Sequence, residues 1–261
     1  MPRLGRIAVF VLAVFGSLPA SAADDLTLFN GKDLDGWVAE GASEVREGDK
    51  VRPVWTVKDG HIRCDGKGFG FLRYGKREFA DFTFHVEFRM EAKCNSGVGV
   101  RTTVFEPAKS RATRPSMYSY EIQLIDDFGK PADVHSSASL YRYVAPTENA
   151  IKSVGEWNTL KITCVGPRVK VVFNNRTVVD VDQTTIDALK AKPLKGYVCL
   201  QNHGGNIEFR EVRIREVEQA AKTSGLREAV RRATTPRHPS SADRAYRPRR
   251  TPMRNVNAQT R

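Results

Sequence analysis

Strict alternation between apolar and polar residues is the feature of this sequence that most constrains its fold. From Phe82 to Met90 every even position is apolar and every odd position is polar or charged. Because successive side chains of a β-strand point to opposite faces of its sheet, this run predicts a strand with one buried and one solvated face. Comparable runs predict further strands at 54–58, 61–64, 97–103, 119–125, 138–143, 157–165, 168–173, 177–182, 196–203 and 206–217.

Turn residues separate these runs at short intervals. Asp59-Gly60 and Gly166-Pro167 each divide two predicted strands, and Asn174-Asn175 suits a tight hairpin. Only 184–191 looks helical, for one or two turns. About ten short strands with hairpin-length links predict an all-β fold, an antiparallel sandwich or barrel. The alternation favours sheets that are solvated on one side over a parallel sheet covered on both.

The first 22 residues have the composition of an export signal. Arg3 and Arg6 precede an apolar run at 7–18, and Ala20-Ser21-Ala22 supplies the small residues that signal peptidase recognises. The apolar run is too short to span about 30 Å of hydrocarbon, although an uncleaved helix in the membrane interface is an alternative. We therefore expect cleavage after Ala22 and a periplasmic or secreted protein, with no later segment apolar enough to cross a membrane.

The net charge of +12 is concentrated at the two ends of the chain. Residues 1–22 carry +2 and residues 218–261 carry +8, which leaves only +2 on the body between them. The tail at 218–261 is rich in Arg and Pro and almost without aromatic residues, a composition that predicts disorder. It is either a solvated extension or an electrostatic contact for acidic surfaces. Export argues against nucleic acid as a partner. The composition of the two ends predicts a signal peptide at 1–22, a β-sandwich domain at 23–217 and a basic tail at 218–261.

The four cysteines leave two alternatives open. In an oxidising compartment Cys64, Cys94, Cys164 and Cys199 could form one or two disulfides, with three possible full pairings, or they could be buried free thiols. The chain has no Cys-x-x-Cys pair and no His/Cys cluster, so a zinc site is not expected. We predict no cofactor and no catalytic metal, while a structural calcium ion on loop oxygens stays open.

Several strands carry hydrogen-bonding or charged side chains opposite their apolar residues. These side chains are expected to converge in a groove if the sheet curves; they belong to Arg101, Glu121, Gln123, Gln201, His203 and Arg210. Gly97, Gly99, Gly204 and Gly205 lie beside them and would let another molecule approach the backbone. The long segments 38–53, 105–117 and 126–137 are expected to line the rim of such a site.

Two of these residues have the chemistry of acid–base catalysts. We expect Glu121 to face Arg101 and Arg210 and so to stay ionised. His203 is expected to titrate near the working pH. For any single one of these residues, an ordinary solvated position on a strand is the alternative.

A series of motifs resembles the 3-keto-disaccharide hydrolase domain family, formerly listed as a domain of unknown function. The first is Leu-Phe-Asn-Gly-Lys-Asp-Leu-Asp-Gly-Trp at 28–37. The resemblance continues through Trp-Thr-Val-Lys-Asp-Gly at 55–60, Asp-Phe at 81–82, Asn-Ser-Gly at 95–97 with Arg101, Tyr-Glu-Ile-Gln at 120–123, Gly-Glu-Trp-Asn at 155–158, Gly-Tyr at 196–197, Leu-Gln-Asn-His-Gly at 200–204 and Glu-Phe-Arg at 208–210. It covers about 26–217. The chain departs from the family pattern at Glu211, in the basic loop 105–117 and in its tail.

This resemblance implies an exported, concanavalin A-like jelly-roll sandwich that cleaves glycosidic bonds in sugars oxidised to a ketone at C3. A C3 ketone acidifies the hydrogen on C2, so one base can remove it while the C1 substituent leaves. The residue roles implied are base for Glu121 or His203, oxyanion and hydroxyl contacts for Arg101, Gln123, Gln201 and Arg210, and sugar contacts at the groove edge for Asn95 and Asp126.

Two other functions compete with this one. Sandwich endoglucanases carry a Glu-x-Asp-x-x-Glu strand, and here Glu121, Gln123 and Asp126 occupy those positions with one acid replaced by an amide. A non-catalytic carbohydrate-binding module is the second alternative, because fold does not decide function. The sugar rings of its ligand would stack on exposed aromatic residues, for which the candidates are Trp37, Trp55, Tyr118 and Tyr141. Trp157 is expected to anchor the sheet.

Overall fold

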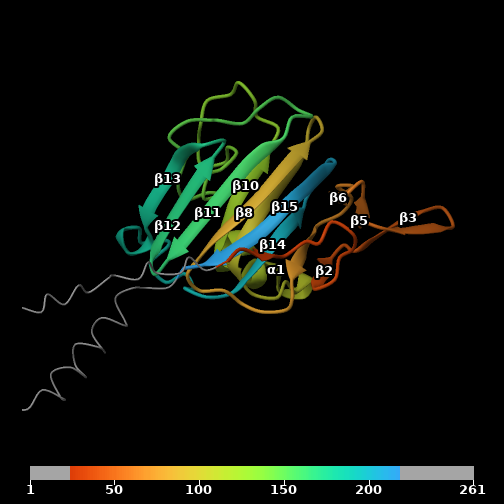
Figure 1. Cartoon of the computed structure of the whole chain (residues 1–261), viewed down its shortest axis with the longest axis horizontal. Helices are drawn as coiled ribbons and strands as arrows, with labels where there is room; N and C mark the ends of the chain where they lie inside the picture. Colours follow the sequence, from red (N-terminus) through yellow and green to blue (C-terminus); the bar gives the residue numbers. More distant parts are fainter. Residues whose placement is uncertain (1–23, 218–261) are drawn as a thin grey trace, which may run out of the picture. The chain divides into compact units, whose positions relative to one another are not determined.

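The computed structural model describes residues 24–217, which form two packed antiparallel β-sheets (Figure 1). The larger sheet has the order β13-β12-β11-β8-β15-β6-β5, with β1 also paired to β15. Its strands are β1 (Leu26–Thr27), β5 (Trp55–Lys58), β6 (His61–Cys64), β8 (Phe82–Met90), β11 (Asn158–Val165), β12 (Arg168–Phe173), β13 (Arg176–Asp182) and β15 (Ile207–Glu216). The predicted antiparallel β-sandwich is therefore confirmed.

The smaller sheet lies behind the larger one in Figure 1 and has the order β10-β9-β14-β7-β2. Its strands are β2 (Trp37–Gly41), β7 (Gly70–Tyr74), β9 (Asn95–Thr102), β10 (Tyr120–Ile125) and β14 (Tyr197–Asn202). A separate hairpin of β3 (Glu44–Glu47) and β4 (Lys50–Pro53) projects from the body, as Figure 1 shows. The short helices are η1 (Pro107–Lys109), α1 (Ser110–Thr113), α2 (Pro115–Tyr118) and η2 (Gln183–Thr185).

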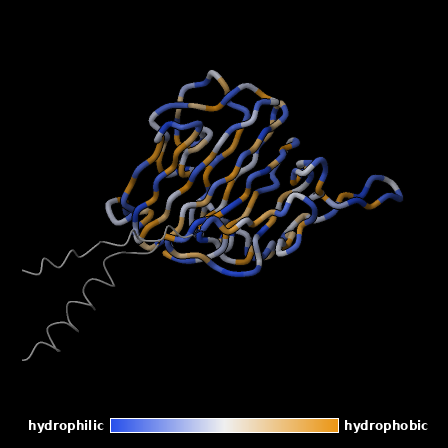
Figure 2. Tube along the Cα trace, viewed as in Figure 1, coloured by the Kyte–Doolittle hydropathy of each residue, from blue (hydrophilic) through white to orange (hydrophobic). Residues whose placement is uncertain are grey.

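The core lies between the two sheets and follows the alternation in the sequence. All the even-numbered residues of β8 are buried, and they pack in one cluster with Val98 and Val100 of β9 and Ile122 and Leu124 of β10. Figure 2 shows the matching alternation of hydrophobic and hydrophilic residues along the strands of the larger sheet. Burying each large apolar side chain contributes about 1.5–3 kcal/mol, so this inner layer holds the sheets together.

The outer face of the smaller sheet is covered by the chain itself. β7 is buried along its whole length, and in β9, β10 and β14 only one end residue is not. Helix α2 packs across β9 and β10. Gly99 permits this close approach, because a Cβ there would lie 3.1 Å from Pro115 Cγ and 2.5 Å from Cys199 Sγ. The expectation that this glycine admits another molecule is corrected, since the segment 103–118 fills the space.

Local predictions failed where tertiary contacts replace a sheet ladder. The run 138–143 is not a strand: Leu140 makes only isolated bridges to Ile122 and Val144. The run 184–191 contains only the end of η2 followed by turns. The sequence analysis also missed the strands β1, β2, β3, β4 and β7 and the helices η1, α1 and α2.

All four cysteines are buried and free in the structure, so the buried-thiol alternative describes them. No helix among residues 24–217 is long and apolar enough to cross a membrane. The predicted signal peptide at 1–22 and the predicted tail at 218–261 lie outside the described residues.

Candidate functional site

Five of the predicted site residues gather on the outer face of the smaller sheet. Glu121 and Gln123 come from β10, Gln201 from β14, His203 follows β14, and Asn95 begins β9. Glu121, Gln123 and Gln201 occupy strand positions opposite the core, as the alternation predicted.

Glycines on the central strand β9 let side chains from its two neighbours meet. Gly99 lies between Glu121 and Cys199 in the register, and Gly97 pairs with Gln123. A Cβ on Gly97 would lie 3.1 Å from the Cγ of Glu121. The missing side chain therefore makes room for the Glu121 carboxyl group, which hydrogen-bonds to the side chain of Gln201. Gln123 Nε2 donates to Asn95 Oδ1 at 3.3 Å.

Glu121 is held in a dry environment. Its exposed fraction is only 5%. Burial raises the pKa of the carboxyl group, and hydrogen bonds from Gln201 and Ser116 and the charge of Arg114 oppose that effect only in part. The carboxyl group therefore keeps its proton to a higher pH than an ordinary glutamate does. The expected placement of Glu121 beside Arg101 and Arg210 is wrong, because neither arginine lies on this face.

His203 is pushed in the opposite direction. Its ring packs edge-on against Phe69, with 5.2 Å between the ring centroids. The guanidinium carbon of Arg114 lies 4.5 Å from the centroid of the same phenyl ring. Partial burial and the nearby charge of Arg114 lower the pKa of the imidazole below its ordinary value. His203 is therefore neutral at pH 7 and able to accept a proton.

Arg114 and Ser116 are functional candidates that the sequence analysis did not single out. Both belong to the covering segment 103–118, whose irregular sequence gave no periodicity from which to place a side chain. The only signal was the length of the loop 105–117, which predicted that it would line the rim of a site.

A buried ion pair anchors the covering segment to the sheet. Glu40 Oε1 accepts a hydrogen bond from Arg73 Nε at 2.5 Å, and its Oε2 accepts one from the backbone N–H of Phe105 at 2.8 Å. Phe105 in turn packs against Phe69 and Phe71, with ring centroids 5.6 and 4.9 Å apart. This chain of contacts links Glu40 to the phenyl ring that supports both His203 and Arg114.

Three polar groups at this site lack hydrogen-bond partners among the described residues. They are the side-chain oxygens Oε1 of Gln123 and Gln201 and the Nε of Arg114, all of them buried. A buried polar group without a partner costs about 1–3 kcal/mol. Two acceptors and one donor of this kind beside Glu121 therefore favour a site that is completed by a polar ligand.

Arg101 does not reach this face, which corrects its predicted role. The register between β9 and β14 shifts near Arg101, and its φ of 54° marks a β-bulge. The bulge turns the side chain into the protein, where none of it is exposed. Its guanidinium group donates to Ala80 O at 2.8 and 3.1 Å and to Gly166 O at 2.8 Å. Arg101 therefore ties together backbone segments inside the sandwich.

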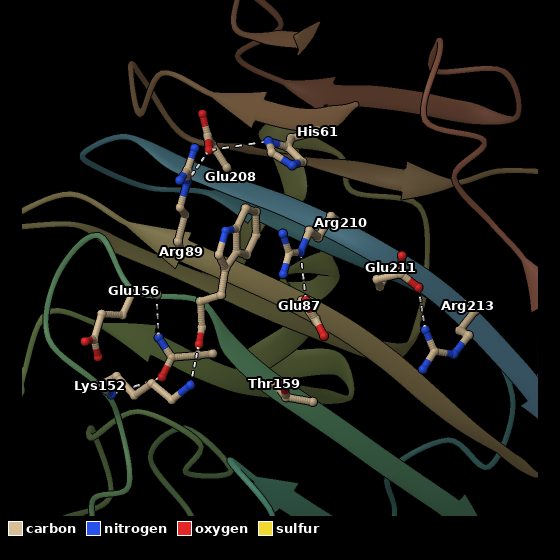
Figure 3. A network of polar contacts seen from close by, with 12 residues as sticks. His61, Glu87, Arg89, Lys152, Glu156, Thr159, Glu208, Arg210, Glu211 and Arg213 are labelled. Carbon is tan, nitrogen blue, oxygen red and sulfur yellow. Dashed lines mark hydrogen bonds and ion pairs between the residues drawn. The ribbon is translucent and has the colours of Figure 1, made fainter. Parts of the chain in front are cut away.

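Arg210 lies on the outer face of the larger sheet (Figure 3). Glu121 belongs to the smaller sheet, so the two residues lie on opposite sides of the sandwich. Its Nε donates to Glu87 Oε2 at 2.7 Å, and its guanidinium carbon lies 3.9 Å from the centroid of the Trp157 ring. Arg89 and His61 contact the same indole at 4.9 Å each. These contacts place Trp157 against the sheet, as its predicted anchoring role requires.

Asp126 lies one residue beyond β10. Its Oδ2 accepts a hydrogen bond from the backbone N–H of Lys93 at 2.8 Å, which fixes the turn before β9. Its predicted contact with a sugar stays a prediction. No cluster of three or more His, Cys, Asp or Glu side chains that could hold a metal ion occurs within residues 24–217.

Comparison with known proteins connects this chain to a family. The model of the 3-keto-alpha-glucoside-1,2-lyase-like domain matches residues 25–215. The chain belongs to this family. A relative, the 3-keto-disaccharide hydrolase of Bacteroides thetaiotaomicron, is 26% identical over an alignment of 241 residues that covers 77% of this chain and 81% of that protein.

Solved structures share the family's sandwich fold. A candidate glycosyl hydrolase of Parabacteroides distasonis has a TM-score of 0.62 and 22% identity, over 74% of this chain and 94% of its own. A second one from the same organism has a TM-score of 0.58 and 24% identity, over 74% of this chain and all of its own. At these identities the likeness establishes the fold alone.

Proposed function

We propose that the protein cleaves glycosidic bonds of 3-keto-glycosides on the outer face of its smaller sheet. The observation that carries this function is a pair of titratable groups with pKa values shifted in opposite directions, Glu121 upward and His203 downward. Environments that separate an acid from a base in this way are typical of acid–base catalysis. Family membership supplies the substrate class, and we infer from the predicted export signal that the protein acts in the periplasm or outside the cell.

Neutral His203 acts as the base in this mechanism. The C3 ketone acidifies the hydrogen on C2, and the imidazole takes it as a proton. The electron pair of the broken C–H bond forms an enolate across C2 and C3. Arg114, whose Nε has no partner among the described residues, donates to the negative oxygen and stabilises it.

Protonated Glu121 acts as the acid. The enolate collapses to form a double bond between C1 and C2, the bond from C1 to the glycosidic oxygen breaks, and Glu121 gives its proton to that oxygen. Addition of water to the double bond afterwards would complete a hydrolysis. The amide groups of Gln123 and Gln201 hold sugar hydroxyls through the side-chain oxygens that lack partners.

Substrate reaches Glu121 only if the covering segment moves. Glu121, Gln123 and Gln201 are each at most 5% exposed, and Ser116 hydrogen-bonds to the Glu121 carboxyl group. Opening of the segment 103–118 admits the sugar, and its return brings Arg114 back and excludes water. A dry site strengthens the electrostatic contribution of Arg114 to the stabilisation of the enolate.

The test is a comparison of two substrates that differ only at C3. The purified protein is incubated with a 3-keto-glucoside and with the unoxidised glucoside, and aglycone release is followed. Release from the ketone alone supports the function proposed. Release from both indicates a conventional glycosidase and overturns the C2 mechanism.

A binding module without catalysis is the second candidate, because the amide oxygens of Gln123 and Gln201 would hold sugar hydroxyls equally well in the absence of chemistry. Release from neither substrate, together with saturable binding of the 3-keto-glucoside, would favour this function. Binding of neither sugar would remove both candidates.

A further inference from the structure

The outer face of the larger sheet carries a groove on the opposite side of the sandwich from Glu121. Its volume is about 440 Å³. Three adjacent strands, β11, β8 and β15, form its floor. The side chains that line it from these strands are Thr83, His85, Lys161, Thr163, Arg213 and Arg215, and Asp25 lies at one edge.

The strand register arranges these side chains in two parallel rows. Lys161 pairs with His85 and His85 pairs with Arg213, which gives the first row. The second row runs in the same way from Thr163 through Thr83 to Arg215. Because directly opposed residues have Cβ atoms about 4.5–5.5 Å apart, each row is about 10 Å wide. Figure 3 shows Arg213 at this side of the sheet, paired with Glu211.

The groove has more positive than negative charge. Asp25 forms ion pairs with both arginines, at 3.1 Å from Arg213 Nε and 2.8 Å from Arg215 Nε, and so orients their guanidinium groups. Glu211 contacts Arg213 at 2.8 Å. Lys161 has no carboxylate partner among the ion pairs of the described residues and is exposed. Three cations therefore line the groove against the single carboxylate of Asp25, with Glu211 outside the lining.

His85 adds a second, independent indication of a ligand. Its Nε2 atom is buried and has no hydrogen-bond partner among residues 24–217. Partial burial and the charges of Arg213 and Lys161 lower the pKa of its imidazole, while Glu87 and Glu211 act in the other direction. Beside it, the hydroxyl groups of Thr83 and Thr163 hydrogen-bond to each other at 3.0 Å, which leaves one of their two protons free for donation to a ligand.

We propose that this groove binds the oxyanion group of an anionic saccharide, a sulfate ester or a carboxylate. Lys161 and Arg215 supply charge-assisted hydrogen bonds to its oxygens. His85 and the free hydroxyl proton of the Thr83–Thr163 pair complete the set of donors. The groove is a binding site separate from the proposed catalytic site and retains an anionic glycan on the other side of the sandwich.

The test is calorimetric titration of the purified protein with four probes at low ionic strength. The probes are inorganic sulfate, a sulfated disaccharide, a uronate-containing disaccharide and a neutral disaccharide. We expect saturable binding of at least one anionic disaccharide. Inorganic sulfate should bind more weakly, and the neutral disaccharide should give no binding signal. Comparison of the two anionic disaccharides identifies which oxyanion the groove prefers. Binding of inorganic sulfate without either saccharide would reduce the site to a simple anion site and overturn the saccharide assignment.

Matched variants separate a defined site from diffuse attraction. Lys161→Gln should weaken binding about tenfold or more, because it removes a charge-assisted contact. Lys170→Gln removes the same charge from the neighbouring strand β12, outside the lining, and should leave the affinity within about twofold. Equal losses in the two variants, or no binding of any anion to the unaltered protein, would overturn the proposal. Unchanged denaturation midpoints confirm that both variants fold.

Titration of His85 by nuclear magnetic resonance locates the bound anion. An anion in the groove favours the protonated imidazole, so a saturating anionic disaccharide should raise the pKa of His85. Arg213, Lys161, Arg215, Asp25, Glu87 and Glu211 surround this ring and are unchanged between the two titrations. Binding that leaves the His85 titration curve in place would show that the anion lies elsewhere and would contradict the proposal.

Discussion

Replacement of Arg101 by Met distinguishes a structural arginine from a substrate-binding one. The side chain is fully buried, and it supplies the hydrogen bonds that Ala80 O and Gly166 O accept. Arg101→Met leaves these two carbonyl groups without those donors. At about 1–3 kcal/mol for each unsatisfied group, the expected loss of stability is about 2–6 kcal/mol. This is a large part of the roughly 5–15 kcal/mol that stabilises a typical domain.

Thermal and urea denaturation measure this loss. For a domain of this size each kcal/mol shifts Tm by about 2–4 °C, so Tm should fall by roughly 4–24 °C. Arg210→Met is the matched control, because Arg210 is partly exposed and only its contacts with Glu87 and Trp157 are lost. Those contacts contribute up to about 2 kcal/mol. Unchanged stability of Arg101→Met together with lost turnover of a 3-keto-glucoside would refute the structural role and restore the one predicted from sequence.

Three further predictions concern the proposed catalytic site. Glu121→Gln should abolish turnover. Burial raises the pKa of this carboxyl group in the folded state, so the stability that the protonated carboxyl group contributes is lost as the pH rises through that pKa. The variant should therefore be at least as stable as the unaltered protein at pH 7, and a lower denaturation midpoint of the variant would contradict this reasoning. On the acid side, the rate should fall through a pKa below that of an ordinary histidine, as His203 becomes protonated. On the alkaline side, it should fall through a pKa above that of an ordinary glutamate, as Glu121 loses its proton. If the fall in rate at acid pH persists in His203→Gln, His203 is excluded as the base. Glu40→Gln leaves Arg73 buried without its carboxylate partner, which should lower the free energy of unfolding measured in urea by about 3–5 kcal/mol. Because the covering segment is then held less firmly, the variant should also raise KM more than it lowers kcat. An unchanged KM would argue against the anchoring role of Glu40.

The sequence placed the residues of the site correctly where the strands are regular. Glu121, Gln123 and Gln201 lie opposite the core because β10 and β14 keep an uninterrupted period of two. The same rule failed at Arg101, because one bulge residue with positive φ reverses the direction of the side chain. The residue type at position 101 does not allow this bulge to be predicted from the sequence.

The assignment of each strand to one of the two sheets was a second feature that the local sequence pattern could not predict. Alternation correctly put Arg210 on an outer face, but it could not tell that β15 and β10 belong to different sheets. Sheet membership depends on pairings between strands that are distant in the sequence, and these follow from the packing of the whole core. The predicted groove therefore combined residues from both sides of the sandwich.

The covering segment was the third feature beyond the sequence. Gly97 and Gly99 correctly indicated a close approach to the backbone, but the approaching groups are the chain's own Glu121 and Pro115. A glycine shows that space is needed without showing what fills it. Arg114 and the burial that raises the pKa of Glu121 both follow from this segment, so neither could be predicted from local pattern.

The most direct test of the proposed chemistry is the fate of the C2–H bond. Aglycone release is followed under single-turnover conditions with a 3-keto-glucoside and with the same compound deuterated at C2. Removal of the C2 hydrogen by His203 predicts distinctly slower release from the deuterated compound, and loss of its deuterium to water. Equal rates with deuterium retained at C2 would contradict proton abstraction, and with it the central role given to the outer face of the smaller sheet.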